Sequence, residues 1–379
     1  MKNAIRKMDK PLFFATLLLI VIGLVMVFSS SSVVAVLQYR VSTYYFFRKQ
    51  LFVVLIGLAF GLFFLLNFPI KNYHPFKSIF MLGIIAALAG LFFYGTVTNS
   101  AQSWYRIGPV SLQPSEFAKT VVIIYMACYF GKNINNERRF FFLRPIIACG
   151  IVAGMIFLQP DLGTAAIIGL LVFAMFMAVP FAKGDRDVRI FKILGTAAIG
   201  LVVIVMFFGG ELLNSEQASR LTYRAPCERY QMKTGYQVCN GMIAINNGGL
   251  FGVGLGNSTQ KYMYLPEAHT DFIFPIIVEE LGSIFASFVI LLYAFILYRL
   301  LCIARRAKDL TSSLISYGTA VLILLHVLIN LGGILALIPL TGVPLPLLSY
   351  GGSITLNTII LIFISLRVSI ENNTKRDAN

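Results

Sequence analysis

The chain has 379 residues, of which 58% are hydrophobic and only 12% are charged. A soluble domain would carry about 25% charged residues, so the composition excludes an ordinary soluble protein. The net charge of +15 would suit a nucleic-acid-binding protein, but the placement of the basic residues, described below, argues against that function.

Apolar runs long enough to cross a bilayer recur along the whole chain. The first run, residues 11–36, is too long for the core of a signal peptide and lacks a small-residue cleavage site, so we interpret it as a span. The sequence predicts an all-α polytopic membrane protein, with ten transmembrane helices in one bundle and a single domain over residues 1–379. We expect the spans near residues 12–31, 50–68, 78–96, 117–131, 145–159, 163–181, 193–210, 272–298, 313–336 and 353–368.

The basic residues predict how these spans are oriented. With the N-terminus in the cytoplasm, about two thirds of the 31 Lys and Arg residues fall in inner loops and tails. This bias supports ten spans with both termini cytoplasmic. The basic excess is therefore a topology signal and an attraction to anionic lipid, not a nucleic-acid footprint.

Three outer segments interrupt the apolar pattern. The first, residues 98–119, contains the only tryptophan, Trp104. The second is a long extracellular loop between spans seven and eight, residues 211–271, and loops of that length are usually functional. It contains Cys227 and Cys239, for which the sequence leaves open a disulfide or two free thiols. The third, residues 339–353, is too apolar for a solvated loop and too rich in Pro and Gly for a helix, so a re-entrant segment is expected.

Five acids lie at or inside the outer ends of the spans, namely Glu116, Asp161, Asp271, Glu279 and Glu280. A charge at membrane depth costs on the order of 2.5–3.5 kcal/mol, so each is expected to be paired or functional. Glu116 and Lys119 are three residues apart and share a helical face. We expect Lys119 to pair with Glu116 or Asp161 and to fix the bundle, with a direct substrate role as the alternative.

Asp271 differs from the other acids because the long outer loop meets the membrane there. An acid between water and lipid can have a raised pKa and act as a general base, while the alternative is an N-terminal cap for the eighth span. Glu279 and Glu280 lie two turns deeper in the same span. At least one must face the bundle interior, and pairing with Lys or Arg is the expected role.

Several other activities are excluded by the lack of a motif. The sequence has no P-loop, no HExxH and no aspartate-rich motif for a metal-bound pyrophosphate. The GVGLG stretch at residues 252–256 has no preceding strand or following helix, which rejects a dinucleotide-binding interpretation. ATP-driven transport within this chain is not expected.

Five motifs in order resemble the FtsW/RodA (SEDS) family: QPSEFAK, QPDLGTA, GGLFGVGLGNSTQK, LPEAHTDFIF followed by EELG, and TGVPLPLLSYGGS. The resemblance covers nearly the whole chain. It implies a ten-span peptidoglycan glycosyltransferase that polymerises lipid II and works with a class B penicillin-binding transpeptidase. The first span, KYMYLPEAHTDF and TGVPLPLLSYGG resemble the division members (FtsW) more than the elongation members (RodA).

The resemblance also assigns roles to residues of this chain. The essential aspartate of the family matches Asp271, and the tryptophan before QPSEFAK matches Trp104, with Arg106 beside it. The lysine and aspartate that pair in the family match Lys119 and Asp161. Trp104 would suit packing against a sugar face, and anchoring at the membrane interface is the alternative.

The implied reaction converts an α-linked donor into a β-1,4 product, so one base and no protein nucleophile suffice. Asp271 would accept the proton of the acceptor hydroxyl, and cations or backbone N–H groups of the glycine-rich stretch would stabilise the departing pyrophosphate. The implied substrate-binding residues are Trp104, Arg106, Lys261, Arg220, His269 and Ser349, with Lys119 as a further cation. A divalent cation, Mg²⁺ or Mn²⁺, would suit the pyrophosphate, although no dedicated ligands and no metal motif are readable.

Other functions compatible with the sequence are a lipid II flippase, a RodA-type polymerase of elongation and shape, and a scaffold that only recruits a partner enzyme. A transporter should carry its charges near the midplane, whereas these acids gather at the outer end. The resemblance implies a multi-pass protein of the bacterial cell membrane that acts at the division septum with other divisome proteins. No nucleic-acid partner is expected.

Overall fold

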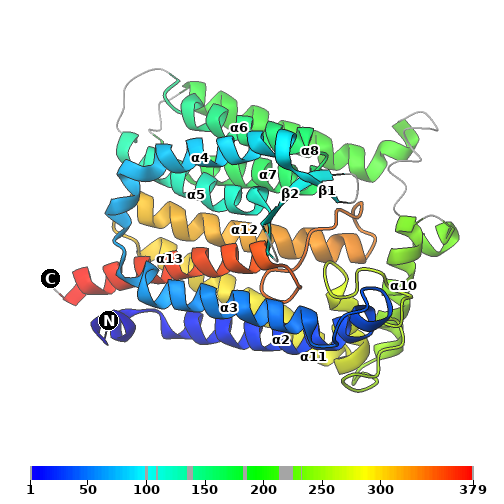
Figure 1. The fold of residues 1–379 in the computed structure, drawn as a ribbon. Coiled ribbons are helices and arrows are strands. Elements are labelled where there is room, and N and C mark those ends of the chain that lie inside the picture. The colour runs from blue at the N-terminus through cyan, green and yellow to red at the C-terminus, as the bar shows by residue number, and fades with distance from the viewer. Residues whose placement is uncertain are drawn as a thin grey trace.

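The computed structural model describes residues 2–98, 101–107, 110–134, 140–181, 186–212, 225–231 and 233–377. Long helices lie side by side in one bundle (Figure 1). The helices are α1 (Lys2–Lys7), α2 (Lys10–Leu37), α3 (Tyr45–Phe63), α4 (Tyr73–Tyr94), α5 (Pro114–Asn133), α6 (Leu143–Leu158), α7 (Leu162–Ala178), α8 (Arg186–Leu212), α10 (Lys233–Gly248), α11 (Ile273–Arg306), α12 (Leu310–Ile334) and α13 (Gly352–Asp377). Short 3-10 turns are η1 (Leu65–Asn67), η2 (Ile70–Asn72) and η3 (Pro226–Arg229).

Each expected span overlaps one of the helices α2–α8 and α11–α13. Within the described residues, six segments are long and apolar enough to cross a membrane, formed by α2, α3 with η1, η2 with α4, α11, α12 and α13. The helices α6 and α7 are apolar but shorter. The protein is therefore a multi-pass helical membrane protein, while the count of ten crossings stays a prediction.

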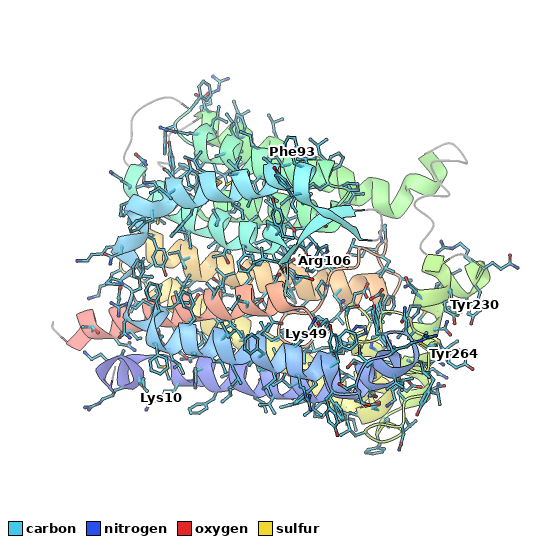
Figure 2. All side chains as sticks on the ribbon, viewed as in Figure 1. Lys10, Lys49, Phe93, Arg106, Tyr230 and Tyr264 are labelled. Atoms are coloured by element: carbon cyan, nitrogen blue, oxygen red, sulfur yellow. A yellow bond between two sulfur atoms is a disulfide. The ribbon has the colours of Figure 1, made fainter. Side chains whose placement is uncertain are left out.

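The central helices can be recognised by how much of their apolar surface is covered. The apolar windows of α12 and α13 are 67% and 83% buried, whereas that of α4 is 22% buried. Helix α4 presents Phe93, which is 80% exposed, at the outside of the bundle (Figure 2). Since lipid covers an apolar outer surface without cost, α12 and α13 form the core and α4 lies at the periphery.

Both chain ends lie at the same end of the bundle (Figure 1). The Asp9 N–H donates to Ser369 Oγ at 3.0 Å, and the Asp9 carboxylate forms an ion pair with Arg299 at 2.5 Å. The Asn373 amide donates to the Lys7 carbonyl at 2.7 Å. Lys10 lies at this end, whereas Tyr230 and Tyr264 lie at the other (Figure 2). This arrangement agrees with an even number of crossings.

The first outer segment forms a small sheet that the all-α prediction misses. Strands β1 (Thr96–Thr98), β2 (Ala101–Ile107) and β3 (Val110–Leu112) pair antiparallel in that order. The Tyr105 hydroxyl donates to the Ala87 carbonyl of α4 at 2.8 Å, which ties the sheet to the bundle. Aromatic and β-branched residues favour strands, but two of these strands are too short to give a clear alternating pattern.

The second outer segment is not irregular throughout, because it contains η3 and the sixteen-residue helix α10. Cys227 and Cys239 form a disulfide that joins these two elements, with their Cα atoms 5.0 Å apart. Of the two possibilities left open by the sequence, the structure has the disulfide. Helix α10 lies closely against α11, where Gly248 meets the backbone at Val278 and has no room for a Cβ.

A candidate active site at the head of α11

Asp271 lies directly before the first turn of α11 and is 9% exposed. The residue at the N-cap is Phe272, and no side chain caps the helix. The alternative of Asp271 as a helix cap is therefore wrong. Its carboxylate instead accepts a hydrogen bond from the Thr270 hydroxyl at 3.1 Å, and the same hydroxyl lies 2.8 Å from the Glu267 carboxylate.

Burial raises the pKa of Asp271 from 3.8 to about 7, and the nearby negative charge of Glu267 adds to the increase. The hydrogen bond from Thr270 opposes this shift. Burial also lowers the pKa of the neighbouring His269 to about 4, so that imidazole is neutral at pH 7. A carboxyl group with a pKa close to neutral is suited to take up a proton during a reaction.

The segment between α12 and α13 enters the bundle, as expected for a re-entrant segment. A Cβ at Gly23, midway along α2, would overlap the Leu347 carbonyl oxygen, so the glycine allows the two backbones to touch. The Tyr293 hydroxyl of α11 donates to the Pro346 carbonyl at 2.5 Å. We refer to residues 339–351 as the re-entrant segment. Within it, the non-helical stretch from Val343 to Ser349 is largely buried by protein, as depth in a membrane requires, whereas Thr341 and Gly342 are exposed.

Asp271 is held against the re-entrant segment. The amide of Asn330 on α12 donates to the Asp271 carbonyl at 2.7 Å and to the Val343 carbonyl at 2.8 Å. Gly342 has a φ of +67°, and the Asp271 carboxylate lies 3.6 Å from where its Cβ would be. The absence of a side chain at Gly342 therefore leaves space beside the Asp271 carboxylate.

His269 and Ser349 support this region from inside the protein. The His269 carbonyl accepts the Tyr350 N–H at 2.8 Å, and its ring packs 4.8 Å from Phe46 and 5.6 Å from Tyr350. The Ser349 hydroxyl is fully buried and accepts the Leu345 N–H at 2.9 Å. In this conformation neither side chain is open to a ligand, which places both in the support of the site.

Lys119 is fully buried on α5 and forms an ion pair with Glu116 at 2.6 Å. Its ammonium also lies 3.0 Å from His326 Nε2. Asp161 caps α7 by accepting the Thr164 N–H at 3.1 Å, and Gln113 donates to it at 3.3 Å. Lys119 and Asp161 both belong to the described residues, and no ion pair joins them. Of the two expected partners, Glu116 and Asp161, the structure pairs Lys119 with Glu116.

Lys261 and the paired glutamates form a second buried network. The Lys261 ammonium lies 2.9 Å from Glu280 and donates to the Gly256 carbonyl at 2.5 Å, while Ser29 of α2 donates to Glu280 at 2.6 Å. Glu279 accepts hydrogen bonds from Ser258, Thr259 and Asn247, all neutral donors. Both glutamates are therefore satisfied in the interior, and Lys261 is occupied by Glu280.

The glycine-rich stretch uses its N–H groups to support α11. Helix α11 is kinked at Gly282, where φ is +84°, and the Val253 and Gly254 N–H groups donate to the Glu279 and Glu280 carbonyls at 2.9 and 3.0 Å. These two N–H groups replace the helical hydrogen bonds lost at the kink. They are therefore not available to a pyrophosphate in this conformation.

The remaining substrate-binding candidates lie on the sheet or outside the described residues. Trp104 is half-buried on β2, opposite Thr96, and Arg106 is exposed on the same strand, opposite Ser111. Arg220 lies outside the described residues. Within the described part of the chain, no group of three or more His, Cys, Asp or Glu side chains gathers to hold a metal ion.

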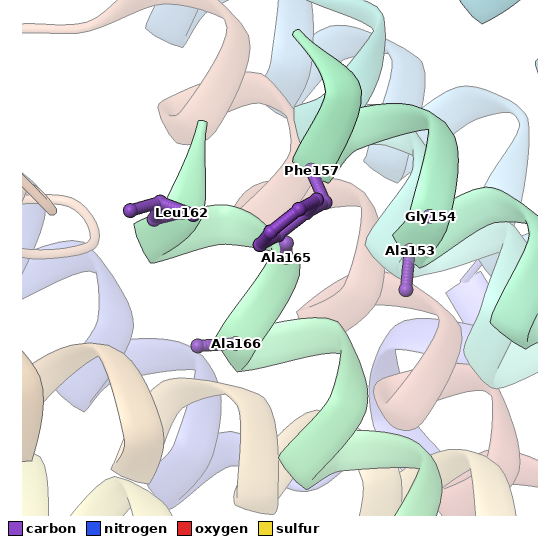
Figure 3. A pocket seen from close by; sticks show the side chains of 6 residues that line it. All are labelled: Ala153, Gly154, Phe157, Leu162, Ala165 and Ala166. Carbon is purple, nitrogen blue, oxygen red and sulfur yellow. The ribbon is translucent and has the colours of Figure 1, made fainter. Parts of the chain in front are cut away.

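An apolar groove lies between α6 and α7, with a volume of about 500 Å³. It is lined by Ala153, Gly154, Phe157, Leu162, Ala165 and Ala166 (Figure 3). No titratable group lines it, so the groove holds no acid–base chemistry.

Three polar residues inside helices were not identified from the sequence. Asn330 and His326 bind the re-entrant segment from α12, and Gln50 binds it from α3 through Ser349 and Gly351. The available signal was a lone polar side chain within an apolar span, which is costly unless it is bonded. Their partners are backbone carbonyl and N–H groups, which no sequence motif identifies.

The model of the FtsW/RodA/SpoVE cell cycle protein family matches residues 10–374. The chain belongs to this family. It is 40% identical to the probable peptidoglycan glycosyltransferase FtsW of Bacillus subtilis, over 99% of this chain and 95% of that protein. It is 36% identical to stage V sporulation protein E of the same organism, over 95% of this chain and 96% of that protein.

Solved structures confirm the FtsW/RodA/SpoVE fold. A chain from a study of polymerization and crosslinking by a peptidoglycan synthase complex superposes with a TM-score of 0.74, at 23% identity, covering 96% of this chain and 98% of that one. The rod shape determining protein RodA of Thermus thermophilus superposes with a TM-score of 0.66, at 22% identity, covering 96% of each chain.

Proposed function

We propose that this chain is a peptidoglycan glycosyltransferase that polymerises lipid II into glycan strands at the outer face of the membrane. The observation that carries the proposal is Asp271, a buried carboxyl group with a pKa of about 7 held beside the re-entrant segment. The family membership and the relatives named peptidoglycan glycosyltransferases support the same activity.

In this reaction Asp271 is the general base. Its carboxylate takes the proton from the 4-hydroxyl of the GlcNAc of lipid II, and that oxygen attacks the anomeric carbon of the growing chain. The bond from this carbon to the pyrophosphate breaks, and undecaprenyl pyrophosphate leaves with the electron pair. The anomeric configuration inverts in one step, so no covalent intermediate with the protein is needed.

Arg106 is the exposed cation closest in sequence to QPSEFAK, and it is our candidate for the pyrophosphate among the described residues. Trp104, two residues before it, would pack against a sugar. A divalent cation, Mg²⁺ or Mn²⁺, would add charge neutralisation at the pyrophosphate. Lys119 and Lys261 are assigned to structural ion pairs, since both are buried and paired.

We further propose that the protein acts in septal wall synthesis with a class B penicillin-binding transpeptidase and other divisome proteins. The FtsW name of the 40%-identical relative supports the division role. A structural neighbour comes from a complex that combines polymerization with crosslinking, which supports a transpeptidase partner. The ten crossings and the cytoplasmic termini are part of the same proposal.

The test uses purified protein and lipid II, with and without a class B partner, and measures glycan strands on a gel. Wild type should make polymer, and Asp271→Asn should lower the rate by about 10²–10⁴-fold, the usual contribution of a general base. If wild type makes no polymer even with its partner, the proposed glycosyltransferase activity is refuted. Normal polymerisation by Asp271→Asn would refute only Asp271 as the base.

A further inference from the structure

Two polar residues of α12 bind successive backbone carbonyls of the re-entrant segment beside Asp271. His326 and Asn330 are four residues apart and thus lie on one face of the helix. His326 Nδ1 lies 3.2 Å from the Pro344 carbonyl, and the Asn330 amide donates to the Val343 carbonyl at 2.8 Å. They are 2% and 4% exposed. Neither reaches the Asp271 carboxylate, so the proposed reaction uses neither directly.

The tautomer of His326 follows from its contact with Lys119. An ammonium group can only donate, so His326 Nε2, 3.0 Å from Lys119 Nζ, must accept. The ring proton is then on Nδ1 and is donated to Pro344. Glu116 holds the ammonium at 2.6 Å from the other side. The buried charge pair of α5 therefore fixes a neutral histidine as a donor to the re-entrant segment.

Asn330 connects the same segment to the proposed base. Its amide has two N–H groups, and both are used, one for the Asp271 carbonyl at 2.7 Å and one for Val343. This bridge sets the separation between Asp271 and Gly342, whose missing side chain leaves space at the carboxylate. A shift of the segment would therefore change the surroundings of the base.

We propose that His326 and Asn330 are positioning residues for the glycosyl transfer, with Lys119 and Glu116 fixing the donor state of His326. Together they hold the re-entrant segment so that Asp271 stays in its buried, productive position. The inference rests on the proposed polymerase function and adds residues that touch neither substrate nor the reacting atoms.

The readout is the dependence of kcat/KM on pH, which reports the free enzyme and which a purely structural role would not move. The carboxylate of Asp271 must be ionised to act, so wild-type kcat/KM should rise with pH with a midpoint near 7. Glu267 is the charged group that acts on Asp271, its neighbour His269 is neutral, and the facing residues Asn330 and Gly342 carry no charge. Loss of the hydrogen bonds from His326 or Asn330 to the re-entrant segment should expose Asp271 to water, which weakens the effect of burial on its pKa and lowers the midpoint.

The experiment measures lipid II polymerisation for purified Asn330→Leu, His326→Leu and His326→Gln. The two leucine variants should lose about 10–100-fold in kcat, as expected when a reacting group is misplaced by about 1 Å. Their KM for lipid II should stay close to that of wild type, and the midpoint of the pH profile should fall by about one unit or more. His326→Gln keeps one acceptor for Lys119 and one donor for Pro344, and should recover most of kcat.

Thr319→Val is the matched control. Thr319 is fully buried two turns before His326 on α12, and its hydroxyl accepts from Ser365 at 3.3 Å rather than contacting the re-entrant segment. This variant should keep the wild-type kcat and midpoint. An unchanged midpoint in both leucine variants, or equal losses in His326→Gln and His326→Leu, would overturn the inference. If Asn330→Leu does not fold, the comparison of His326→Leu with His326→Gln tests the positioning role. Failure of wild type to polymerise would instead reject the function itself.

Discussion

At the scale of single residues, the proposed role of Asp271 as a base requires a side chain that a hydroxyl of the substrate can reach and that is sheltered from water. Its surroundings achieve this with burial at the head of α11 and with the negative charge of Glu267, which together raise its pKa to about 7. The same shift has a cost, because an acid that is harder to ionise in the folded protein destabilises the fold at high pH. Activity and stability therefore oppose each other at this side chain.

Asp271→Asn should make the protein more stable above pH 7. Between about pH 4 and 7 the folded protein binds more protons than the unfolded chain, so stability falls as pH rises through this window and stays low above it. Removal of the titrating group abolishes this loss. Melting temperatures of wild type and variant across pH 4–9 check the prediction, and curves that stay parallel over the whole range would contradict it.

The sequence singled out Asp271 as a candidate base but did not predict its surroundings. Its motif and its position indicated a residue at the membrane–water interface, because burying an acid near an apolar span is costly and such acids are rare. The choice between base and cap depended on whether the side chain bonds to the first turn, which local sequence does not decide. In the same way, Lys261 looked available for a pyrophosphate until folding brought it to Glu280, nineteen residues further along the chain.

At the scale of elements, the re-entrant segment organises the site. It is held from α2, α3, α11 and α12, through a close backbone contact at Gly23 and hydrogen bonds from Gln50, Tyr293 and Asn330. Each bond satisfies a backbone group that lies where no lipid could satisfy it. The segment is therefore pre-organised before any substrate arrives.

Gly23→Val should displace the re-entrant segment, because any Cβ at this position overlaps the Leu347 carbonyl. We expect a loss of about 1–3 kcal/mol of stability, typical of overpacking, together with a marked loss of polymerisation. Gly83→Val on α4 is the matched control, since a Cβ there meets nothing within 4 Å. Thermal unfolding and polymer yield measure both effects, and equal results for the two variants would contradict the contact.

The approximate helix positions were predictable because apolar runs bounded by charge are a strong pattern, although several helix ends differ from the expected spans by up to nine residues. The small sheet and helix α10 could not be predicted from the sequence. Strands of three residues carry too little periodicity, and the sequence of α10 mixes Gly and Asn with apolar residues. Helix α10 is stabilised by its packing on α11 at Gly241 and Gly248 and by the disulfide at Cys239, and such tertiary contacts override local propensity.

At the scale of the whole molecule, the bundle has two chemically different ends. The termini lie at one end, and the strands and α10, which carries Cys239 of the disulfide, lie toward the other (Figure 1). The proposed topology puts the first end in the cytoplasm because most basic residues gather in the segments expected there. In that topology, the proposed lipid-linked substrates would reach the site from the outer leaflet.

This topology predicts that Cys227 and Cys239 face the outside. In intact cells, a membrane-impermeant maleimide should label them only after a mild reductant has opened the disulfide. A green fluorescent protein fused to the C-terminus should fluoresce in the same cells, since it folds in the cytoplasm. The double variant Cys227→Ser/Cys239→Ser is the control for labelling elsewhere. Labelling that requires permeabilised membranes would reverse the assigned orientation.

Because the two ends of the chain are close together, the protein should tolerate circular permutation. Since residues near both termini bond to each other, through Asp9 with Ser369 and Lys7 with Asn373, a short peptide could join them without unwinding a helix. The short connection between α11 and α12 lies at the same end as the joined termini. A circularly permuted gene that begins at Asp309 should therefore encode the same bundle, with its new ends at the same end of the bundle as the original ones.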